Sequence, residues 1–120
     1  MKPEELIAGT AVYFDVLSYK VHSMFDADLN ELAGLLKSNP NLKIELIGHS
    51  DTDEVNEAKV NIRYEGMALK RANSVKEFLV LKGISEVRLS TSSKDNTELA
   101  SDKPTPLSKA QNRRVLFVVK

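Results

Sequence analysis

Alternation of hydrophobic and polar residues predicts several strands in this chain. In residues 43–49, Ile44 and Leu46 fall on one face and charged side chains on the other, a pattern typical of a strand with one buried face. Thr10–Phe14 is apolar and β-prone, and Arg114–Val119 is rich in valine. The last run has the composition of a central strand.

Hydrophobic residues recur at helical spacing in two longer segments. The first begins at a capping residue, Asp26 or Asp28, and ends at Asn39-Pro40, because proline cannot continue a helix. The second is predicted over Met67–Lys82, with Gly83 placed to terminate it. The apolar stripes that support these two helices are Leu29, Leu32, Leu35 and Leu36, and then Ala68, Ala72, Val75, Phe78 and Leu79.

The remaining segments carry weaker patterns. Val87–Ser90 predicts a short third strand, and Leu107–Asn112 a short helical turn. We interpret Asp15–Met24 as an extended loop, and Ser92–Pro106 as a long polar loop. Thr52–Glu65 lacks a sustained apolar stripe, so we interpret it as a mobile flap, a loop with at most one turn of helix.

The order of these elements predicts the architecture. Strands alternate with helices up to the third strand, which favours parallel strand neighbours with helices packed against the sheet. A chain of 120 residues is long enough for one domain with a real core. We therefore predict a single domain over residues 1–120, in which residues 1–9 form a linker or terminal tail.

Composition excludes several classes of partner. Seventeen basic and seventeen acidic residues cancel, so no overall field favours nucleic acid or an anionic membrane surface. The chain has no cysteine, which excludes disulfides and thiolate metal sites. Its first residues contain no long apolar run, so we predict no signal peptide and no insertion of this domain into a membrane.

The candidate site lies where the second predicted strand ends. Gly48-His49-Ser50-Asp51-Thr52 is small and polar, and Arg71 lies in the first turns of the second long helix. An aspartate and an arginine facing one cleft would bind a zwitterion, because a guanidinium pairs with a carboxylate through two parallel hydrogen bonds. We expect Asp51 and Arg71 to lie across such a shallow, open cleft. The alternatives are that Asp51 caps a turn and that Arg71 is a solvated helix residue.

Other chemistry finds little support. His49 and His22 lack partners at metal-ligand spacing, so we predict no metal site and no general base. Asp51 and Asp53 could form a carboxylate pair, but no nucleophile or acid accompanies them. We therefore predict no cofactor and no enzymatic activity. Arg113 and Arg114 are more consistent with structural ion pairs at the start of the last strand than with a nucleic-acid-binding patch.

Several short motifs in order resemble a known family. These are Phe14-Asp15, Gly48-His49-Ser50-Asp51, Arg71-Ala72, Gly83-Ile84 and Asn112-Arg113-Arg114-Val115. Together they resemble the OmpA-like peptidoglycan-binding domain of outer-membrane protein A, peptidoglycan-associated lipoprotein and the flagellar stator B protein. The resemblance implies an α+β fold: a β-α-β-α-β-β sandwich of a mixed four-stranded sheet with two main helices packed on one face.

The resemblance also implies a function. It implies non-catalytic anchoring of an envelope protein to peptidoglycan in the periplasm, tethered to the outer membrane by a segment outside these 120 residues. The ligand would be the diaminopimelate of the stem peptide, with its ammonium on Asp51 and its carboxylate on Arg71. Envelope proteins would be further partners. The longer spacing between Asp51 and Arg71 and the altered start of the second helix favour an alternative: a protein-interaction module that has lost peptidoglycan binding.

Overall fold

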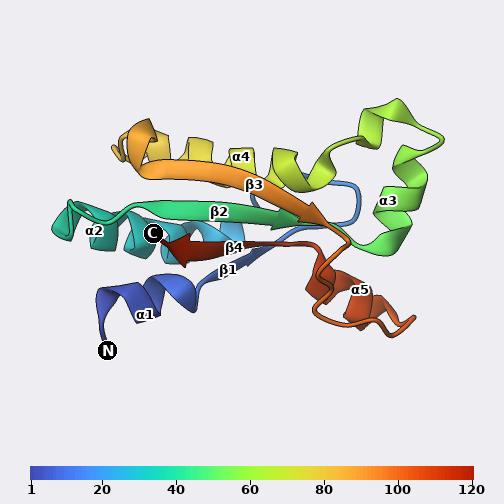
Figure 1. Ribbon diagram of the computed structural model, residues 1–120, viewed down its shortest axis with the longest axis horizontal. Coiled ribbons are helices and arrows are strands. Elements are labelled where there is room, and N and C mark those ends of the chain that lie inside the picture. Colours follow the sequence, from blue (N-terminus) through green and yellow to red (C-terminus); the bar gives the residue numbers. More distant parts are fainter.

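The computed structural model describes all 120 residues, whose four strands form one mixed sheet in the order β1-β4-β2-β3 (Figure 1). Strand β4 is antiparallel to both of its neighbours, whereas β2 and β3 run parallel. The last strand therefore lies inside the sheet, as its valine-rich sequence predicts. The strands are β1 (Ala11–Tyr13), β2 (Ile44–His49), β3 (Leu89–Asp95) and β4 (Arg114–Val119).

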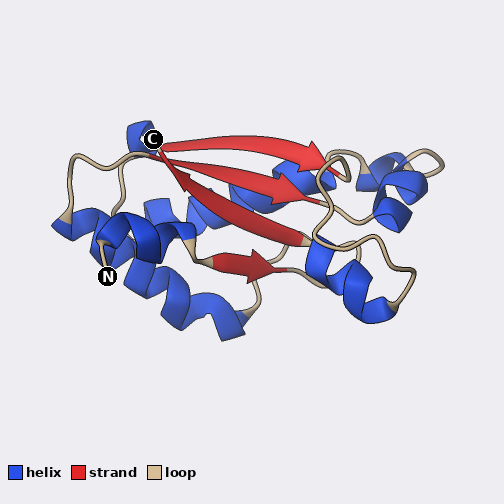
Figure 2. Ribbon diagram, turned by 60° about the horizontal axis from the view of Figure 1, so that its bottom comes forward, coloured by secondary structure: helices blue, strands red, loops and turns tan.

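Helices α2 and α4, the two longest, pack side by side on one face of the sheet (Figure 2). This is the α+β arrangement that the resemblance implies. None of the helices is both long and apolar enough to cross a membrane. The helices are α1 (Pro3–Ala8), α2 (Asp26–Ser38), α3 (Thr52–Ala58), α4 (Met67–Leu81) and α5 (Pro106–Asn112), with 3₁₀ turns at Ser23–Phe25, Ile62–Tyr64 and Glu86–Arg88.

The core lies between this helical layer and the sheet. It combines the predicted helical stripes with alternate residues of the strands, which is the geometry expected of a sheet buried on one face. Gly83 follows α4 with φ +98°, a backbone conformation that glycine adopts without strain, and so ends the helix as predicted. The buried apolar residues include Leu29, Leu32 and Leu36 of α2, Ala72, Val75 and Leu79 of α4, and Ile44, Leu46, Val115 and Phe117 of the strands.

Three expectations about the elements are wrong. Residues 1–9 are not a free tail, because Pro3–Ala8 form α1 and Ile7 is buried in the core. The third strand is Leu89–Asp95 rather than Val87–Ser90, so the polar loop predicted from Ser92 begins only after Asp95. Its second half is polar because β3 is an edge strand, whose outer side faces solvent, so hydrophobicity alone misplaces it.

The third error concerns Thr52–Glu65, which is not a loop with at most one helical turn. Thr52–Ala58 forms α3, and a 3₁₀ turn follows at Ile62–Tyr64. The helix has no apolar stripe, and it starts instead from a capping box between Asp51 and Glu54. Whether the segment is mobile stays a prediction.

Candidate functional site

The predicted site forms where β2 ends and α3 begins. Gly48 lies so close to α4 that a Cβ built there would be 1.8 Å from the carbonyl oxygen of Ala68. Only glycine lets strand and helix approach this closely. This contact brings Arg71, one turn further along α4, against the end of β2.

Asp51 caps α3 and is buried, with only 1% of its surface exposed. Its Oδ1 accepts a hydrogen bond of 2.7 Å from the backbone N–H of Glu54, and the Glu54 carboxylate accepts one from the backbone N–H of Asp51. Its Oδ2 pairs with Arg113 Nη1 at 3.0 Å. The capping alternative for Asp51 is therefore correct, and both of its carboxylate oxygens are occupied.

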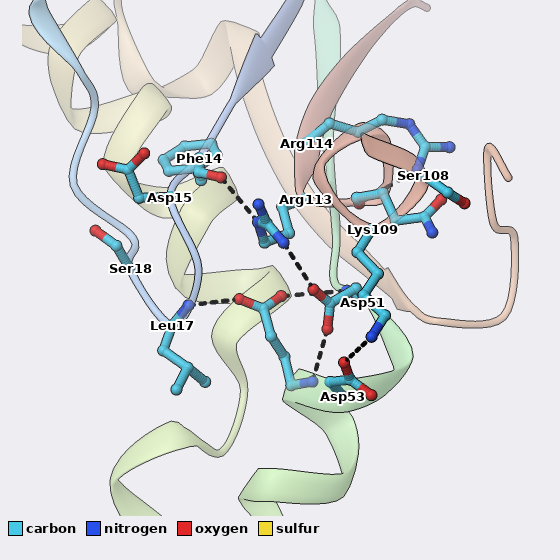
Figure 3. A network of polar contacts seen from close by, with 12 residues as sticks. Phe14, Asp15, Leu17, Ser18, Asp51, Asp53, Ser108, Lys109, Arg113 and Arg114 are labelled. Atoms are coloured by element: carbon cyan, nitrogen blue, oxygen red, sulfur yellow. Dashed lines mark hydrogen bonds and ion pairs between the residues drawn. The ribbon is translucent and has the colours of Figure 1, made fainter. Parts of the chain in front are cut away.

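Arg113 links the cap of α3 to the first strand. Its Nε donates to the carbonyl oxygen of Phe14 while its Nη1 donates to Asp51, and Figure 3 shows the side chain reaching between them. The predicted structural ion pair is confirmed for Arg113. It is wrong for Arg114, which donates to the carbonyl oxygens of Asn112 and Glu98 instead of a carboxylate.

Arg71 is completely buried, with 0% of its surface exposed. It forms a bidentate pair with Glu54, Nη1 to Oε1 at 2.7 Å and Nη2 to Oε2 at 2.5 Å. Its remaining N–H groups donate to the carbonyl oxygens of Ser18, His49 and Asp15. All five N–H donors of the guanidinium therefore have partners.

The expected open cleft is thus wrong. Asp51 and Arg71 do lie at the carboxyl end of β2, and both contact Glu54, but neither charged group faces solvent. The two carboxylates and two guanidiniums of Asp51, Glu54, Arg71 and Arg113 form a buried network, which their pairing and hydrogen bonds make tolerable. The binding roles of Asp51 and Arg71 stay predictions.

The other predicted site residues surround this network. Gly48 makes the close approach to α4, and the backbone N–H of Ser50 donates to the carbonyl oxygen of Asp95. Thr52 is exposed on the first turn of α3. The imidazole of His49 is buried, and its Nδ1 has no hydrogen-bond partner. Burial lowers the pKa of His49 to about 4, and the positive charges of Arg114 and Lys94 contribute to the same shift.

Sequence reasoning missed Glu54, which contacts both Asp51 and Arg71. It accepts hydrogen bonds from Arg71, from the backbone N–H of Asp51, and from the backbone N–H of Leu17 in the loop after β1. One signal was available: aspartate followed three residues later by glutamate is a capping box. That spacing predicts the helix start, although not the pairing with Arg71.

Several cavities border this network, and two of them are lined almost entirely by polar residues. One, of about 270 Å³, has Asp51, Asp53 and Lys109 in its wall. Lys109 and Asp53 pair there at 2.7 Å (Figure 3), and this hydrogen bond raises the pKa of Lys109. The other, of about 300 Å³, lies beside Asp15 and Ser18. No group of three or more His, Asp or Glu side chains is arranged to hold a metal ion.

Comparison with known proteins decides the family. The sequence model described as the OmpA family matches residues 13–113. The chain belongs to the OmpA family. This domain is 34% identical over 115 residues to the peptidoglycan-associated lipoprotein of Buchnera aphidicola subsp. Baizongia pistaciae. That alignment covers 96% of this chain and 64% of the lipoprotein, so the chain spans under two thirds of its relative's length.

Solved structures agree with the family assignment. The crystal structure of the peptidoglycan-associated lipoprotein from Burkholderia pseudomallei matches the OmpA-family domain with a TM-score of 0.85 and 29% identity, covering 99% of this chain and 97% of that one. The C-terminal domain of Helicobacter pylori MotB matches with a TM-score of 0.77 and 17% identity, covering 92% and 84%. At that identity the second match shows the fold alone.

Proposed function

We propose that this domain is a non-catalytic peptidoglycan-binding module that anchors an envelope protein to the cell wall from the periplasm. The observation that carries the proposal is that one carboxylate, Asp51, and one guanidinium, Arg71, both lie at the carboxyl end of β2 and both contact Glu54, in an OmpA-family fold. The name of the Buchnera relative, a peptidoglycan-associated lipoprotein, supports the same partner.

The proposed ligand is the diaminopimelate side chain of the stem peptide. Its free end carries one ammonium and one carboxylate, which match Asp51 and Arg71 in sign. Arg71 would hold the carboxylate through two parallel N–H···O bonds, the geometry that it already makes with Glu54. The domain would do no chemistry on this ligand, because its role is attachment.

A second candidate function is a protein-interaction module that has lost peptidoglycan binding. The specific observation that favours it is the saturation of Arg71, whose five donors all have partners within the chain. Under this candidate, the buried network only stabilises the fold, and cell-wall polymer has no access to it.

Retention on purified peptidoglycan sacculi separates the two candidates. Asp51→Asn removes the charge that would hold the ammonium but keeps a residue that caps helices well. Asp53→Asn, two positions on, is the matched control, because Asp53 is exposed. Loss of one partner of a hydrogen-bonded charge pair costs about 2 kcal/mol or more, roughly thirtyfold in affinity.

We therefore expect sacculi to retain the parent and Asp53→Asn but to lose Asp51→Asn, with all three folded by circular dichroism. A parent that stays in the supernatant would refute peptidoglycan binding. Equal retention of Asp51→Asn and the parent would refute the site.

A further inference from the structure

Glu54 occupies the position on Arg71 that a ligand carboxylate would need. Its two carboxylate oxygens bind Nη1 and Nη2 at 2.7 and 2.5 Å, and it is itself 98% buried, with 2% of its surface exposed. A guanidinium has one edge for such a bidentate pair with its two terminal nitrogens. A ligand carboxylate could form the same pair only after Glu54 has left.

Helix α3 is held against the domain by polar contacts rather than by the hydrophobic core: Glu54 pairs with Arg71 of α4, and Asp53 pairs with Lys109 of α5. Glu54 is the one buried residue of α3, and no residue of α3 belongs to the core cluster. The apolar residues of the following segment point into solvent, with Val60 81% and Ile62 80% exposed. Figure 1 shows α3 and this segment at the end of the molecule, beyond the sheet. Detaching this segment would expose little further apolar surface, so the main cost of opening would be the loss of the polar contacts of Glu54.

Glu54 also keeps one carboxylate oxygen of Asp51 from a ligand. The backbone N–H of Glu54 donates a hydrogen bond to Oδ1 of Asp51, while the side chain of Glu54 accepts hydrogen bonds from Arg71. Unwinding the first turn of α3 would therefore release the anion and the cation of the proposed site in one movement. Arg113 would remain on the other oxygen of Asp51.

We infer that Glu54 is an internal substitute for the ligand carboxylate, and that α3 is a latch that keeps the peptidoglycan site closed until the stem peptide displaces Glu54. This inference rests on the proposed function. It reconciles the saturation of Arg71 with peptidoglycan binding, because the closed site is one state of an equilibrium. A ligand that binds only the open state has its affinity reduced by the fraction of molecules that are open.

The first test measures the affinity for a soluble diaminopimelate-containing stem peptide by calorimetry. Glu54→Gln keeps the shape and an acceptor oxygen but weakens the pair with Arg71. Glu57→Gln, an exposed residue of the same helix, is the matched control. If the parent is open about one tenth of the time, Glu54→Gln should bind more tightly by up to about tenfold, and Glu57→Gln should bind as the parent does. A Glu54→Gln variant that binds no more tightly than the parent would overturn the latch.

The second test needs no peptidoglycan. Glu54→Ala leaves Arg71 buried beside an empty carboxylate position, so acetate should bind there and raise the folded fraction and Tm of this variant. Acetate is compared with chloride at equal ionic strength, and Glu57→Ala is the control. Acetate that stabilises Glu54→Ala no more than Glu57→Ala would overturn the inference, even if Glu54→Ala is largely unfolded in chloride.

The two tests separate the latch from the proposed function. Acetate rescue of Glu54→Ala without stem-peptide binding by any variant would support the internal carboxylate and refute the peptidoglycan ligand. Tight binding by the parent, without a gain in Glu54→Gln or acetate rescue, would support the proposed function and refute the latch.

Discussion

Arg71 and Glu54 stabilise each other inside the domain, and each would be costly without its partner. Both are at least 98% buried, so removing Arg71 leaves an unpaired carboxylate in the interior. Removal of one partner of a buried ion pair costs more than the pair contributes against apolar replacements. This is a different energetic role from that of an open ligand site, where exposed charges contribute little.

Arg71→Met should lower the free energy of unfolding by about 3–5 kcal/mol, because Glu54 keeps its burial and loses its counter-charge. Urea denaturation of Arg71→Met, Glu54→Gln and the double variant measures this. We expect the double variant to lose at least about 1 kcal/mol less than the sum of the two single variants. Strict additivity would show that the pair is not coupled.

His49 should make stability depend on pH. The unfolded chain binds a proton near pH 6.5, whereas the folded protein keeps His49 neutral down to a pKa of about 4 because burial disfavours the charge. Between these values the unfolded state binds more protons, so stability falls as pH falls from 6.5 towards 4.

Protonation of His49 in the unfolded state should lower the free energy of unfolding by about 2 kcal/mol by pH 5. Urea denaturation at pH 7.5 and pH 5 measures this change in the free energy of unfolding for the parent, for His49→Asn and for the exposed control His22→Asn. His49→Asn should lose less stability on acidification than the other two. Parallel behaviour of all three proteins would assign the pH dependence to other groups.

The residues of the candidate site could be predicted from the sequence only in part. Asp51 and Arg71 stand out because a strand-end acid and an early helix arginine match a family motif. Their burial could not be predicted, since it depends on Glu54 packing against α4 from 17 residues away in the chain. A polar residue type indicates exposure on average, and the capping-box spacing of Asp51 and Glu54 predicts a helix start but not the burial of Glu54.

Among the elements, the contact between β2 and α4 is the one that positions the site. Because Gly48 has the Ala68 backbone directly against its Cα, the two elements lie closer than side chains would allow. The same contact sets the depth at which Arg71 meets the carbonyl of His49.

Gly48→Ala should therefore destabilise the domain by about 3 kcal/mol or more, because the added methyl group meets backbone atoms that cannot rotate away. Gly34 is the control: it lies inside α2 with open space around its Cα, so Gly34→Ala should stabilise by about 0.5–1 kcal/mol. Thermal unfolding of both variants tests this. A Gly48→Ala protein as stable as the parent would contradict the close approach.

Helix α3 should exchange its amide hydrogens faster than α4, because α4 is anchored by several core residues whereas Glu54 is the one buried residue of α3. We expect exchange in residues 55–58 to be at least about tenfold faster than in the middle of α4. Glu54→Gln should speed it further without affecting α4. Equal protection of the two helices would show that α3 opens only when the whole domain unfolds.

Elements with an apolar face were predictable, and those built from polar contacts were not. The stripes of α2 and α4 and the alternation of β2 gave nearly correct bounds. Helix α3 and the second half of β3 were not predicted, because they are stabilised by capping hydrogen bonds and by pairing at the sheet edge rather than by burial of apolar residues. The resemblance to a family implied a mixed sheet with both long helices on one face, but neither it nor periodicity predicted the antiparallel insertion of β4 between β1 and β2.

For the whole molecule, the fold provides a rigid sheet-and-helix frame and places one buried charge network at one end of it. The network carries opposite charges, and the chain belongs to the OmpA family and is 34% identical to a peptidoglycan-associated lipoprotein. In our account this end of the domain binds the zwitterionic end of diaminopimelate, and Glu54 holds the site closed until the ligand arrives.

The most direct measurement compares two stem peptides that differ in one group. Lysine and diaminopimelate share the same side-chain amine, but only diaminopimelate adds a carboxylate beside it, and that carboxylate is the group assigned to Arg71. Calorimetric titration of the parent should give an affinity for the diaminopimelate peptide at least about tenfold higher than for the lysine peptide, because the bidentate pair with Arg71 is lost in the second. Equal affinities for the two peptides, or no binding of either, would contradict the account.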